Sequence, residues 1–385
     1  MIEIFFWFFV WALVHSYVIY PLSLRLYPRE KGQNDPKMTH EELPKVSILL
    51  SLYNEANSVS QKVTSTFHTD YPLDKLTLLI GSDGSDDGTE EKVNELKKKY
   101  RNIRFFPFKE RRGKASVIND LVKHADDAIL IFTDAHAIFE NNTIPYLVNH
   151  FQDAKVGMVG ARMLNKLVSK DGISVQENAY LHLENKLKIS EGEIWGVVMG
   201  VFGACYAIRK DCYVPVPPHF LVDDFFVTFK VLEQKKKVLY ASDAVFYENV
   251  TNRSRDEFRR KVRISAGNFQ NLWHFRSFLW PKSWGLFYAY WSHKVLRWLG
   301  PFFIIGALGL NAALVEQQAL YRATFVLQIL LILGALSDLV FRKLNLHLKP
   351  LRFLNHFYAM NLGLLFGFFK LLFGKRKATW KPTKR

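Results

Sequence analysis

Apolar residues along the chain form two kinds of pattern, and each predicts a different part of the protein. Between residues 46 and 133, short β-branched runs alternate with polar stretches of helical periodicity. The runs KVSILLSLYN, KLTLLIGSDGS, NIRFFPF and DAILIFTDA predict strands, whereas NSVSQKVTSTFHT, TEEKVNELKKKY and KASVINDLVKHA predict helices. Strands that alternate with helices are typical of a parallel sheet covered on both faces, so we expect an α/β fold.

A long apolar run near the N-terminus predicts a membrane anchor within residues 1–24. Ile4 to Tyr20 carries no charged residue and is about as long as the shortest helices that cross a hydrocarbon core. A cleavable signal peptide is the alternative. It fits poorly, because Glu3 precedes the run and no small-residue cleavage site follows it.

The C-terminal part, residues 281–385, predicts a membrane region. Apolar runs near 299–315 and 319–341 predict two spans. The run 353–373 contains several polar residues, and we expect it to lie in the interface or to re-enter the membrane. The aromatic stretch before residue 299 contains two basic residues, which favours a helix in the headgroup layer. Residues 40–280 between the two membrane regions predict one soluble domain.

The positive charge of the chain is concentrated beside the apolar segments. The net charge is +16, and residues 342–385 contain eleven Lys or Arg and no Asp or Glu. Nucleic acid is the usual partner for such an excess. Because these clusters flank apolar helices, we expect membrane lipids as the partner and no nucleic acid. Basic residues Arg25, Arg29 and Lys31 follow the anchor and predict a cytoplasmic soluble domain at the inner or plasma membrane.

Two cysteines, Cys205 and Cys212, are too few for a disulfide framework and lack the spacing of a zinc site. The chemistry must therefore come from other residues.

Polar residues gather where the predicted strands end. Asn54 and Glu55 follow the first strand, Asp83 the second, and Asp134 and His136 the fourth. In parallel sheets ligands bind at the carboxyl ends of the strands. Alone, the aspartates of SDGSDDGT are more typical of a turn and helix cap than of a ligand site. The same polar signature at three strand ends favours a ligand site.

Between about Val46 and Gly267, the order and spacing of these motifs resemble the family-2 inverting glycosyltransferases. The similarity is greatest to the membrane-bound synthases of polysaccharides such as cellulose, hyaluronan and poly-N-acetylglucosamine, and the tail GKRKATWKPTKR shows a weaker echo. The resemblance implies a GT-A (Rossmann-like) fold, a nucleoside-diphosphate sugar donor that is expected to be UDP-linked, and a divalent cation, Mg2+ or Mn2+. It also implies a glycan or lipid-linked acceptor.

The family's donor-binding motifs have counterparts in three segments of this chain, SLYNEA, SDGSDDGT and RRGKASVIN. The resemblance places Tyr53 and Glu55 near the base, and Asp83 against the uracil or ribose, where a carboxylate can accept hydrogen bonds. It places Lys114, a suitable point charge for diphosphate, and Asn119 beside the donor. Leu52 is a mild departure from the family pattern.

FTDAHAIFE corresponds to the family's Asp-x-Asp metal motif, with His136 in the third place. Asp134 is the firmer ligand candidate. His136 suits Mn2+ better than Mg2+, and a structural histidine is the alternative.

FLVDDFFVTFK resembles the family's acidic pair at a helix start. The resemblance makes Asp224 the general base that takes the acceptor's proton, with Asp223 as a positioning residue. A simple N-terminal helix cap is the alternative for this pair. Gly203, in MGVFGACYAIRK, is expected where the backbone must approach a sugar closely.

RRKVRISAGNFQ falls where processive relatives carry Gln-x-x-Arg-Trp. Arg260 replaces the Gln, Arg263 matches the Arg and can bind diphosphate, and Ile264 replaces the Trp. These departures leave two alternatives open, namely transfer of a single sugar to polyprenyl phosphate or a lipid, and a non-catalytic scaffold that binds nucleotide sugar. A further helix is expected over SVQENAYLHLENKLKIS, with Glu177, Tyr180 and Glu184 on one face.

Overall fold

The structure is a computed structural model that describes residues 1–29, 38–165, 174–248, 254–344, 346 and 348–374. It divides into two compact units. The sheet unit consists of the described residues of Pro28–Val168 and Leu181–Val250. The helical unit consists of the described residues of Met1–Tyr27, Ser169–Tyr180 and Thr251–Lys375. The basic tail after residue 374 lies outside the described residues.

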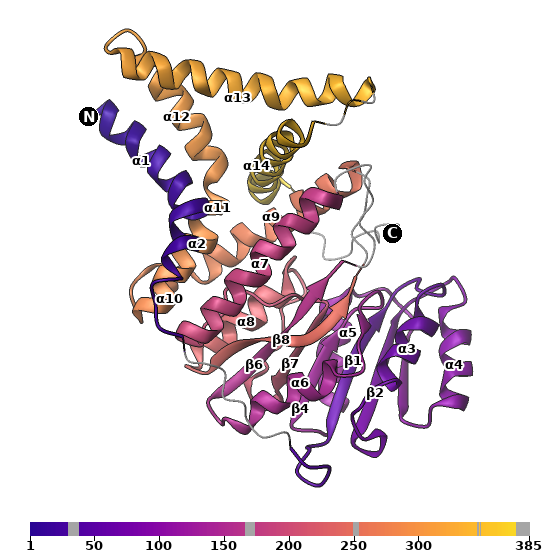
Figure 1. Ribbon diagram of the computed structural model, residues 1–385. Coiled ribbons are helices and arrows are strands. Elements are labelled where there is room, and N and C mark those ends of the chain that lie inside the picture. Colours follow the sequence, from indigo (N-terminus) through magenta and orange to yellow (C-terminus); the bar gives the residue numbers. More distant parts are fainter. Residues whose placement is uncertain (30–37, 166–173, 249–253, 345, 347, 375–385) are drawn as a thin grey trace. The chain divides into compact units, whose positions relative to one another are not determined.

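The sheet unit is built on one eight-stranded sheet in the order β3-β2-β1-β4-β7-β6-β8-β5 (Figure 1). Its strands are β1 (Val46–Leu52), β2 (Leu76–Asp83), β3 (Ile103–Phe108), β4 (Ile129–Thr133), β5 (Ile138–Phe139), β6 (Val156–Leu164), β7 (Cys205–Arg209) and β8 (Lys237–Tyr247). The four strands from β3 to β4 are parallel, as expected. β7 runs antiparallel to both β4 and β6, so the sheet is mixed rather than wholly parallel.

Helices cover both faces of the parallel half of the sheet. They are α3 (Val59–Phe67), α4 (Thr89–Lys99) and α5 (Lys114–His124). Ile48 and Leu50 of β1 share one buried core with Val59 and Val63 of α3. Successive strand residues point to opposite faces. The other face packs against α5, where a Cβ atom on Gly81 would lie only 2.4 Å from the Val117 side chain.

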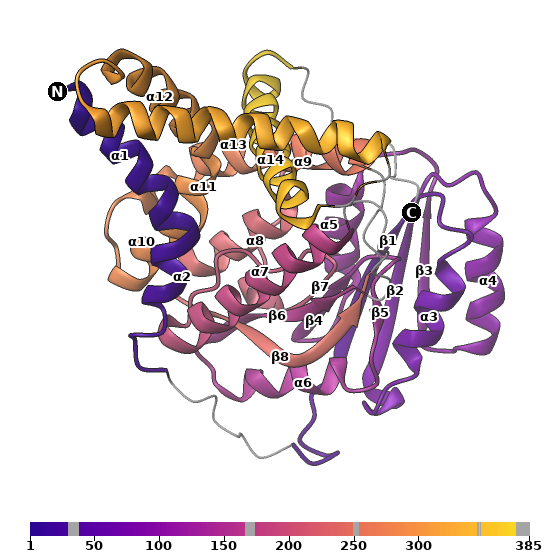
Figure 2. The ribbon, with the colours of Figure 1, turned by 45° about the horizontal axis from the view of Figure 1, so that its top comes forward.

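The remaining helices of this unit flank the second half of the sheet (Figure 2). They are α6 (Thr143–Asn149), α8 (Asp223–Glu233) and the part of α7 (Ser174–Trp195) that follows Tyr180, together with the short 3-10 segments η3 (His150–Gln152) and η4 (Lys210–Cys212). A further 3-10 segment, η2 (Leu73–Lys75), directly precedes β2. The predicted helix over SVQENAYLHLENKLKIS is the first part of α7. The predicted helix at the acidic pair is α8, which starts at Asp223.

Both cysteines lie in the core of the sheet unit. Cys205 is in β7 and Cys212 is in η4, and both are buried free thiols. Burial raises the pKa of Cys205 to about 12 and that of Cys212 to about 11. At neutral pH both thiols therefore stay protonated and unreactive.

The helical unit contains the apolar segments of both chain ends. Its elements are α1 (Ile2–Val14), η1 (His15–Ile19), α2 (Tyr20–Ser23), α9 (Ser254–His274), η5 (Arg276–Leu279), α10 (Trp284–Ala289), η6 (Tyr290–Val295), α11 (Leu296–Trp298), α12 (Gly300–Leu314), α13 (Ala319–Lys343) and α14 (Lys349–Phe373). The pairs α1 and α12, α9 and α14, and α13 and α14 pack against each other. α9, which lies within the predicted soluble domain of residues 40–280, belongs to this unit.

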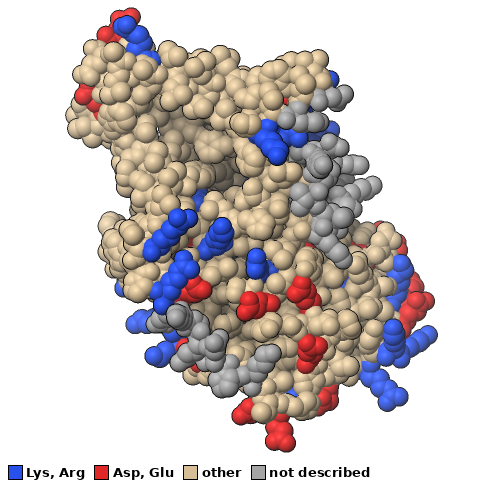
Figure 3. All heavy atoms as spheres, viewed as in Figure 1, with Lys and Arg blue, Asp and Glu red and all other residues tan. Residues whose placement is uncertain are grey.

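Three described helices are long and apolar enough to cross a membrane: Ile2–Ser23, Ala319–Lys343 and Lys349–Phe373. The surface over α13 is almost free of charge (Figure 3). The predicted span near 299–315 corresponds to α12, which passes this test only together with Trp284–Trp298, from which it is bent by 64°. The last apolar run forms α14, which is long and apolar enough to cross a membrane, and its interfacial or re-entrant position stays a prediction.

Charged residues inside the helical unit are paired with one another. Asp338 of α13 is buried and lies 2.9 Å from Arg342. Its other carboxylate oxygen is 3.9 Å from Arg352 of α14. Because an unpaired charge is costly among apolar helices, the contact between Asp338 and Arg352 favours the packing of α13 against α14.

Candidate active site

The strand ends that carry polar residues meet at one edge of the sheet. β1 is hydrogen-bonded to β2 on one side and to β4 on the other, and all three run parallel. Chain order reverses between β1 and β4, and ligands of open α/β sheets bind at such a reversal. The structure therefore brings the predicted residues of SLYNEA, SDGSDDGT and FTDAHAIFE to one edge.

The first two of these loops are joined by hydrogen bonds. The Asn54 side-chain amide donates to the carboxylate of Asp86 at 2.7 Å. The backbone N–H of Ala56 donates to Asp87 at 3.0 Å. Asp87 also accepts from the backbone N–H of Thr89, the first residue of α4, at 3.1 Å. The acidic loop thus binds the first N–H group of α4 and holds the loop after β1 in place, and its role in binding a ligand stays a prediction.

Asp83 organises the loop that leads into α5. Its two carboxylate oxygens accept the backbone N–H groups of Arg112 at 2.7 Å and of Gly113 at 2.8 Å. Gly113 has a φ of 91°, a left-handed conformation that favours glycine, and α5 begins at the next residue. Asp83 is 3% exposed, so a contact with the base or ribose stays a prediction.

Tyr53 lies in the same neighbourhood. The guanidinium of Arg111 stacks over its ring, 3.7 Å from the ring centroid. A stacked ring and cation of this kind offer a flat surface to a nucleotide base.

Lys114 joins two of the predicted acidic residues. Its Nζ lies 2.8 Å from Asp134 Oδ1 and 3.5 Å from Asp223 Oδ2. Although burial acts to lower it, the pKa of Lys114 is raised above its ordinary value by these two carboxylates. The ammonium is therefore fully charged at neutral pH and lies beside the acidic pair at the start of α8.

His136 is paired with Glu55. Its Nε2 lies 3.3 Å from Glu55 Oε2, and Ser58 also donates to that carboxylate. Glu55, which the resemblance places near the nucleotide base, thus contacts the histidine of the metal motif. This contact connects the loop after β1 with the loop after β4.

The described residues contain no group of three or more His, Cys, Asp or Glu that could hold a metal ion by themselves. Asp134 and His136 nevertheless keep 37% and 36% of their side chains exposed. They offer one oxygen and one nitrogen ligand, a set that Mn2+ accepts. The two residues fit a cation whose other ligands come from the phosphate oxygens of a substrate.

Asp224 has the properties of a general base. Its Oδ2 accepts the backbone N–H of Gly203 at 2.9 Å, and its Oδ1 accepts that of Phe225 at 2.8 Å. Burial and the neighbouring Asp223 raise the pKa of Asp224 to about 6. A carboxylate with this pKa is ionised at neutral pH yet a stronger base than an exposed aspartate.

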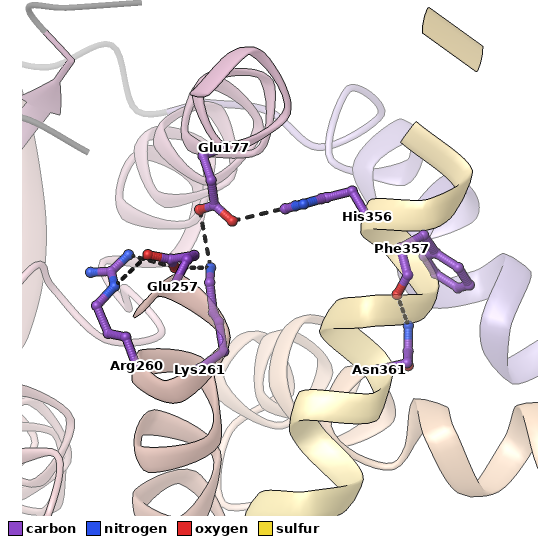
Figure 4. A network of polar contacts seen from close by, with 7 residues as sticks. All are labelled: Glu177, Glu257, Arg260, Lys261, His356, Phe357 and Asn361. Atoms are coloured by element: carbon purple, nitrogen blue, oxygen red, sulfur yellow. Dashed lines mark hydrogen bonds and ion pairs between the residues drawn. The ribbon is translucent and has the colours of Figure 1, made fainter. Parts of the chain in front are cut away.

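Asn119 and the two predicted arginines occupy other surroundings. The Asn119 side chain accepts from Tyr213 at 2.7 Å and exchanges hydrogen bonds with the backbone of Val216, so its amide holds the segment before α8. Arg260 and Arg263 lie on α9 in the helical unit. The Arg260 guanidinium binds the buried carboxylate of Glu257, with Nε at 2.9 Å (Figure 4).

The network in Figure 4 also includes Glu177, which lies 3.2 Å from Lys261 and 3.4 Å from His356. It links the first turns of α7 with α9 and α14. Glu177 and Glu184 are buried, whereas Tyr180 is 42% exposed.

Three residues of the sheet unit near this site were not predicted from the sequence. Arg111 lies within a quoted motif, but nothing distinguishes it from its neighbour Arg112. Glu191 accepts the backbone N–H of Met199 at 3.0 Å and supports the segment that leads to Gly203. Lys62 is a lysine on the buried face of α3, and its spacing of three from Val59 is a signal that could have identified it.

Comparison with known proteins agrees with this geometry. A model of the family "Glycosyl transferase family 2" matches residues 47–213. A poly-beta-1,6-N-acetyl-D-glucosamine synthase of Staphylococcus epidermidis is 24% identical over 61% of this chain and 57% of its own length. The synthase of Staphylococcus aureus strain MSSA476 is also 24% identical, over 68% of this chain and 63% of its own. The chain thus matches about six tenths of the length of these curated relatives.

Among solved structures, a mannosyltransferase from Pyrobaculum calidifontis in complex with GDP-Man and Mn2+ superposes with a TM-score of 0.74. The match covers 97% of this chain and 100% of that one at 22% identity, and it shows a shared GT-A fold. The expected fold and family are thereby confirmed: this chain carries a glycosyltransferase family 2 domain.

Proposed function

We propose that the protein is an inverting glycosyltransferase. It transfers a sugar from a nucleoside-diphosphate sugar to a glycan or lipid-linked acceptor at the cytoplasmic face of the membrane. The observation that carries the proposal is the contact of Lys114 with Asp134 and Asp223, directly beside a base with a pKa near 6. The site thus places the ammonium of Lys114, which can bind a diphosphate, next to the carboxylate of Asp224, which can accept a proton from an acceptor hydroxyl.

The donor half of the site is formed by the joined loops after β1 and β2. Tyr53 and Arg111 offer a flat surface for the base. Lys114 contributes positive charge toward the diphosphate, because its ammonium lies at the carboxyl edge of the sheet. UDP is the leading nucleotide, since the two curated relatives described above are named as N-acetylglucosamine polymer synthases, and GDP is the alternative.

A divalent cation held by Asp134 and His136 would neutralise charge on the departing diphosphate. The chain's own contribution there is the orientation of these two side chains and the adjacent ammonium of Lys114.

The reaction itself needs one base. Asp224 removes the proton of the acceptor hydroxyl as that oxygen bonds to the anomeric carbon. The bond from that carbon to the phosphate oxygen breaks on the opposite side, so the configuration inverts and the nucleoside diphosphate leaves with the bonding electrons. The Gly203 N–H holds the base in place during this step.

Single addition to polyprenyl phosphate or a lipid is the second candidate. It is favoured by Arg260, which stands where processive relatives carry Gln and is already bound to Glu257. Ile264 cannot stack on a sugar as Trp does. Mass spectrometry of the products distinguishes one added sugar from a polymer.

A panel of UDP- and GDP-sugars offered to membranes that contain the protein and its acceptor tests the proposal, with nucleotide release as the readout. We expect release with one donor, and its loss in Asp224→Asn while nucleotide binding is retained. Asp243→Asn, at an exposed position, is the matched control and should behave as wild type. Wild-type turnover by Asp224→Asn would remove this residue from the mechanism, and no release from any donor would favour a non-catalytic scaffold.

A further inference from the structure

A fully buried lysine lies beneath the loop that carries Asp134 and His136. Lys62 of α3 is 0% exposed. Its Nζ donates to the backbone carbonyl of Ala137 at 2.6 Å and lies 3.3 Å from the centroid of the Phe139 ring. Both partners belong to the segment that directly follows the two predicted metal ligands.

Burial of this ammonium is unfavourable, because a charge loses its hydration in the core. Burial lowers the pKa of Lys62 to about 7. An apolar side chain of the same length, such as Met, would fill this space without that cost. The lysine therefore calls for an explanation beyond filling the core.

Its contacts supply that explanation. The loop folds back on itself after β4, where the Ala137 N–H donates to the Asp134 carbonyl at 3.2 Å. The Asp134 N–H donates to the carbonyl of Ala204, in the segment beside Gly203, at 3.2 Å. The Lys62 ammonium holds the end of this turn through its hydrogen bond to the Ala137 carbonyl. Removal of the ammonium would leave a buried carbonyl without its donor and would loosen the turn.

We propose that Lys62 is a positioning residue for the cation site, and that it fixes the backbone from which Asp134 and His136 project by its hydrogen bond to Ala137 and its contact with Phe139. This inference rests on the proposed function. Residues that orient metal ligands from behind commonly change metal affinity about 10–100-fold when they are replaced.

Manganese binding, measured apart from catalysis, tests this role. Mn2+ is titrated into the purified full-length protein with saturating UDP or GDP, whichever gives binding in wild type, and free Mn2+ is followed by electron paramagnetic resonance. We expect Lys62→Met to need about tenfold more Mn2+ for half-saturation. A residue that only stabilises the fold would leave that value unchanged in the folded fraction.

Lys210→Met is the matched control. The Nζ of Lys210 also donates to a backbone carbonyl, that of Ala125 at 2.5 Å, but near the opposite end of β4. We expect its manganese affinity to stay within about twofold of wild type. Equal affinities in Lys62→Met and Lys210→Met would overturn the inference and leave the proposed function intact.

Two further outcomes are decisive. If wild type binds no Mn2+ with either nucleotide, the proposed cation site and this inference both fail. If Lys62→Met does not fold, Phe139→Leu replaces it, because that change removes the ring against which the ammonium packs. A weaker manganese affinity of Phe139→Leu supports the role of Lys62, and an unchanged affinity overturns it.

Discussion

At the scale of single residues, the proposed base Asp224 should determine how activity depends on pH. The base acts only when it is ionised, and burial together with Asp223 raises its pKa to about 6. We therefore expect kcat/KM to fall about tenfold per pH unit below a midpoint near this value. Measurement from about pH 5 to about pH 8 checks it, and a flat profile down to about pH 5 would contradict it.

Acidification should lower activity but increase the contribution of Asp224 to the free energy of unfolding, so the two effects of this group can be separated. Because the folded-state pKa of Asp224 is above its ordinary value, the folded state binds more protons between these two values. The contribution of this group to the free energy of unfolding therefore increases on acidification through that window and is lost as pH rises through about 6. Loss of activity near the midpoint is then not unfolding caused by Asp224.

Gly203 lies so close to the proposed base Asp224 that a side chain at this position would collide with the carboxylate. A Cβ atom at this position would lie 2.8 Å from Asp224 Oδ2. We expect Gly203→Ala to displace the carboxylate and to lower kcat about hundredfold, with a smaller effect on the donor KM. Steady-state kinetics measures both values. Gly309→Ala is the control, because a Cβ there meets nothing within 4 Å, and equal kinetics of both variants would contradict the prediction.

The sequence indicated which residue types gather at the site, but not the contacts that they make. Motif order placed Asp83, Asp134 and Asp224 in one domain, and the structure has all three in the sheet unit. That Asp83 binds backbone N–H groups, and that Lys114 joins two carboxylates, depends on loop conformations far apart in the chain. Such contacts have no periodicity along the sequence, so pattern analysis does not reveal them.

At the scale of elements, the packing of α5 on β2 positions Lys114. Gly81 leaves no room for a side chain, because a Cβ would lie 2.4 Å from Val117 of α5. We expect Gly81→Ala to lower the free energy of unfolding by about 1–3 kcal/mol through overpacking. Denaturant unfolding of the purified protein measures the change. Val117→Ala in the same chain should restore part of the loss, and strictly additive effects would contradict this explanation.

The strands and helices from β1 to β4 followed from the sequence because each has a local pattern. Apolar runs end at polar turns, and α4 has acidic residues in its first turn and lysines in its last. The second half of the sheet lacked such signals. The direction of β7 is set by its pairing with β4 and β6, which is a tertiary contact and leaves no mark on its own five residues.

At the scale of the whole molecule, the disposition of the chain in the membrane is the main prediction. If the bent pair Trp284–Trp298 and Gly300–Leu314 forms one span, the turn at Gln317 lies outside and α13 returns the chain to the cytoplasm. The basic residues Arg342 and Lys343 favour this arrangement. Reporter domains fused after Gln317 and after Lys343 should report opposite sides, the second cytoplasmic. A cytoplasmic Gln317 would instead show that the bent pair re-enters on the same side.

The division into units was only partly predictable. Apolar length identified the anchor and α13, since a span needs about 20 apolar residues. The place of α9 in the helical unit was not predictable from the sequence, because α9 is polar and its packing against α14 is a contact between distant segments. The polar residues of α14, a helix of 25 residues, likewise made its sequence compatible with an interfacial or re-entrant position as well as with a span.

The buried cysteines have a practical consequence for studies of this protein in solution. Neither Cys205 nor Cys212 presents its sulfur to solvent, and burial keeps both protonated. A maleimide dye would therefore react with a single thiol engineered on the surface and leave the native pair untouched. Fluorescence from one defined point could then follow donor arrival in real time, without first rebuilding the core to remove its sulfur atoms.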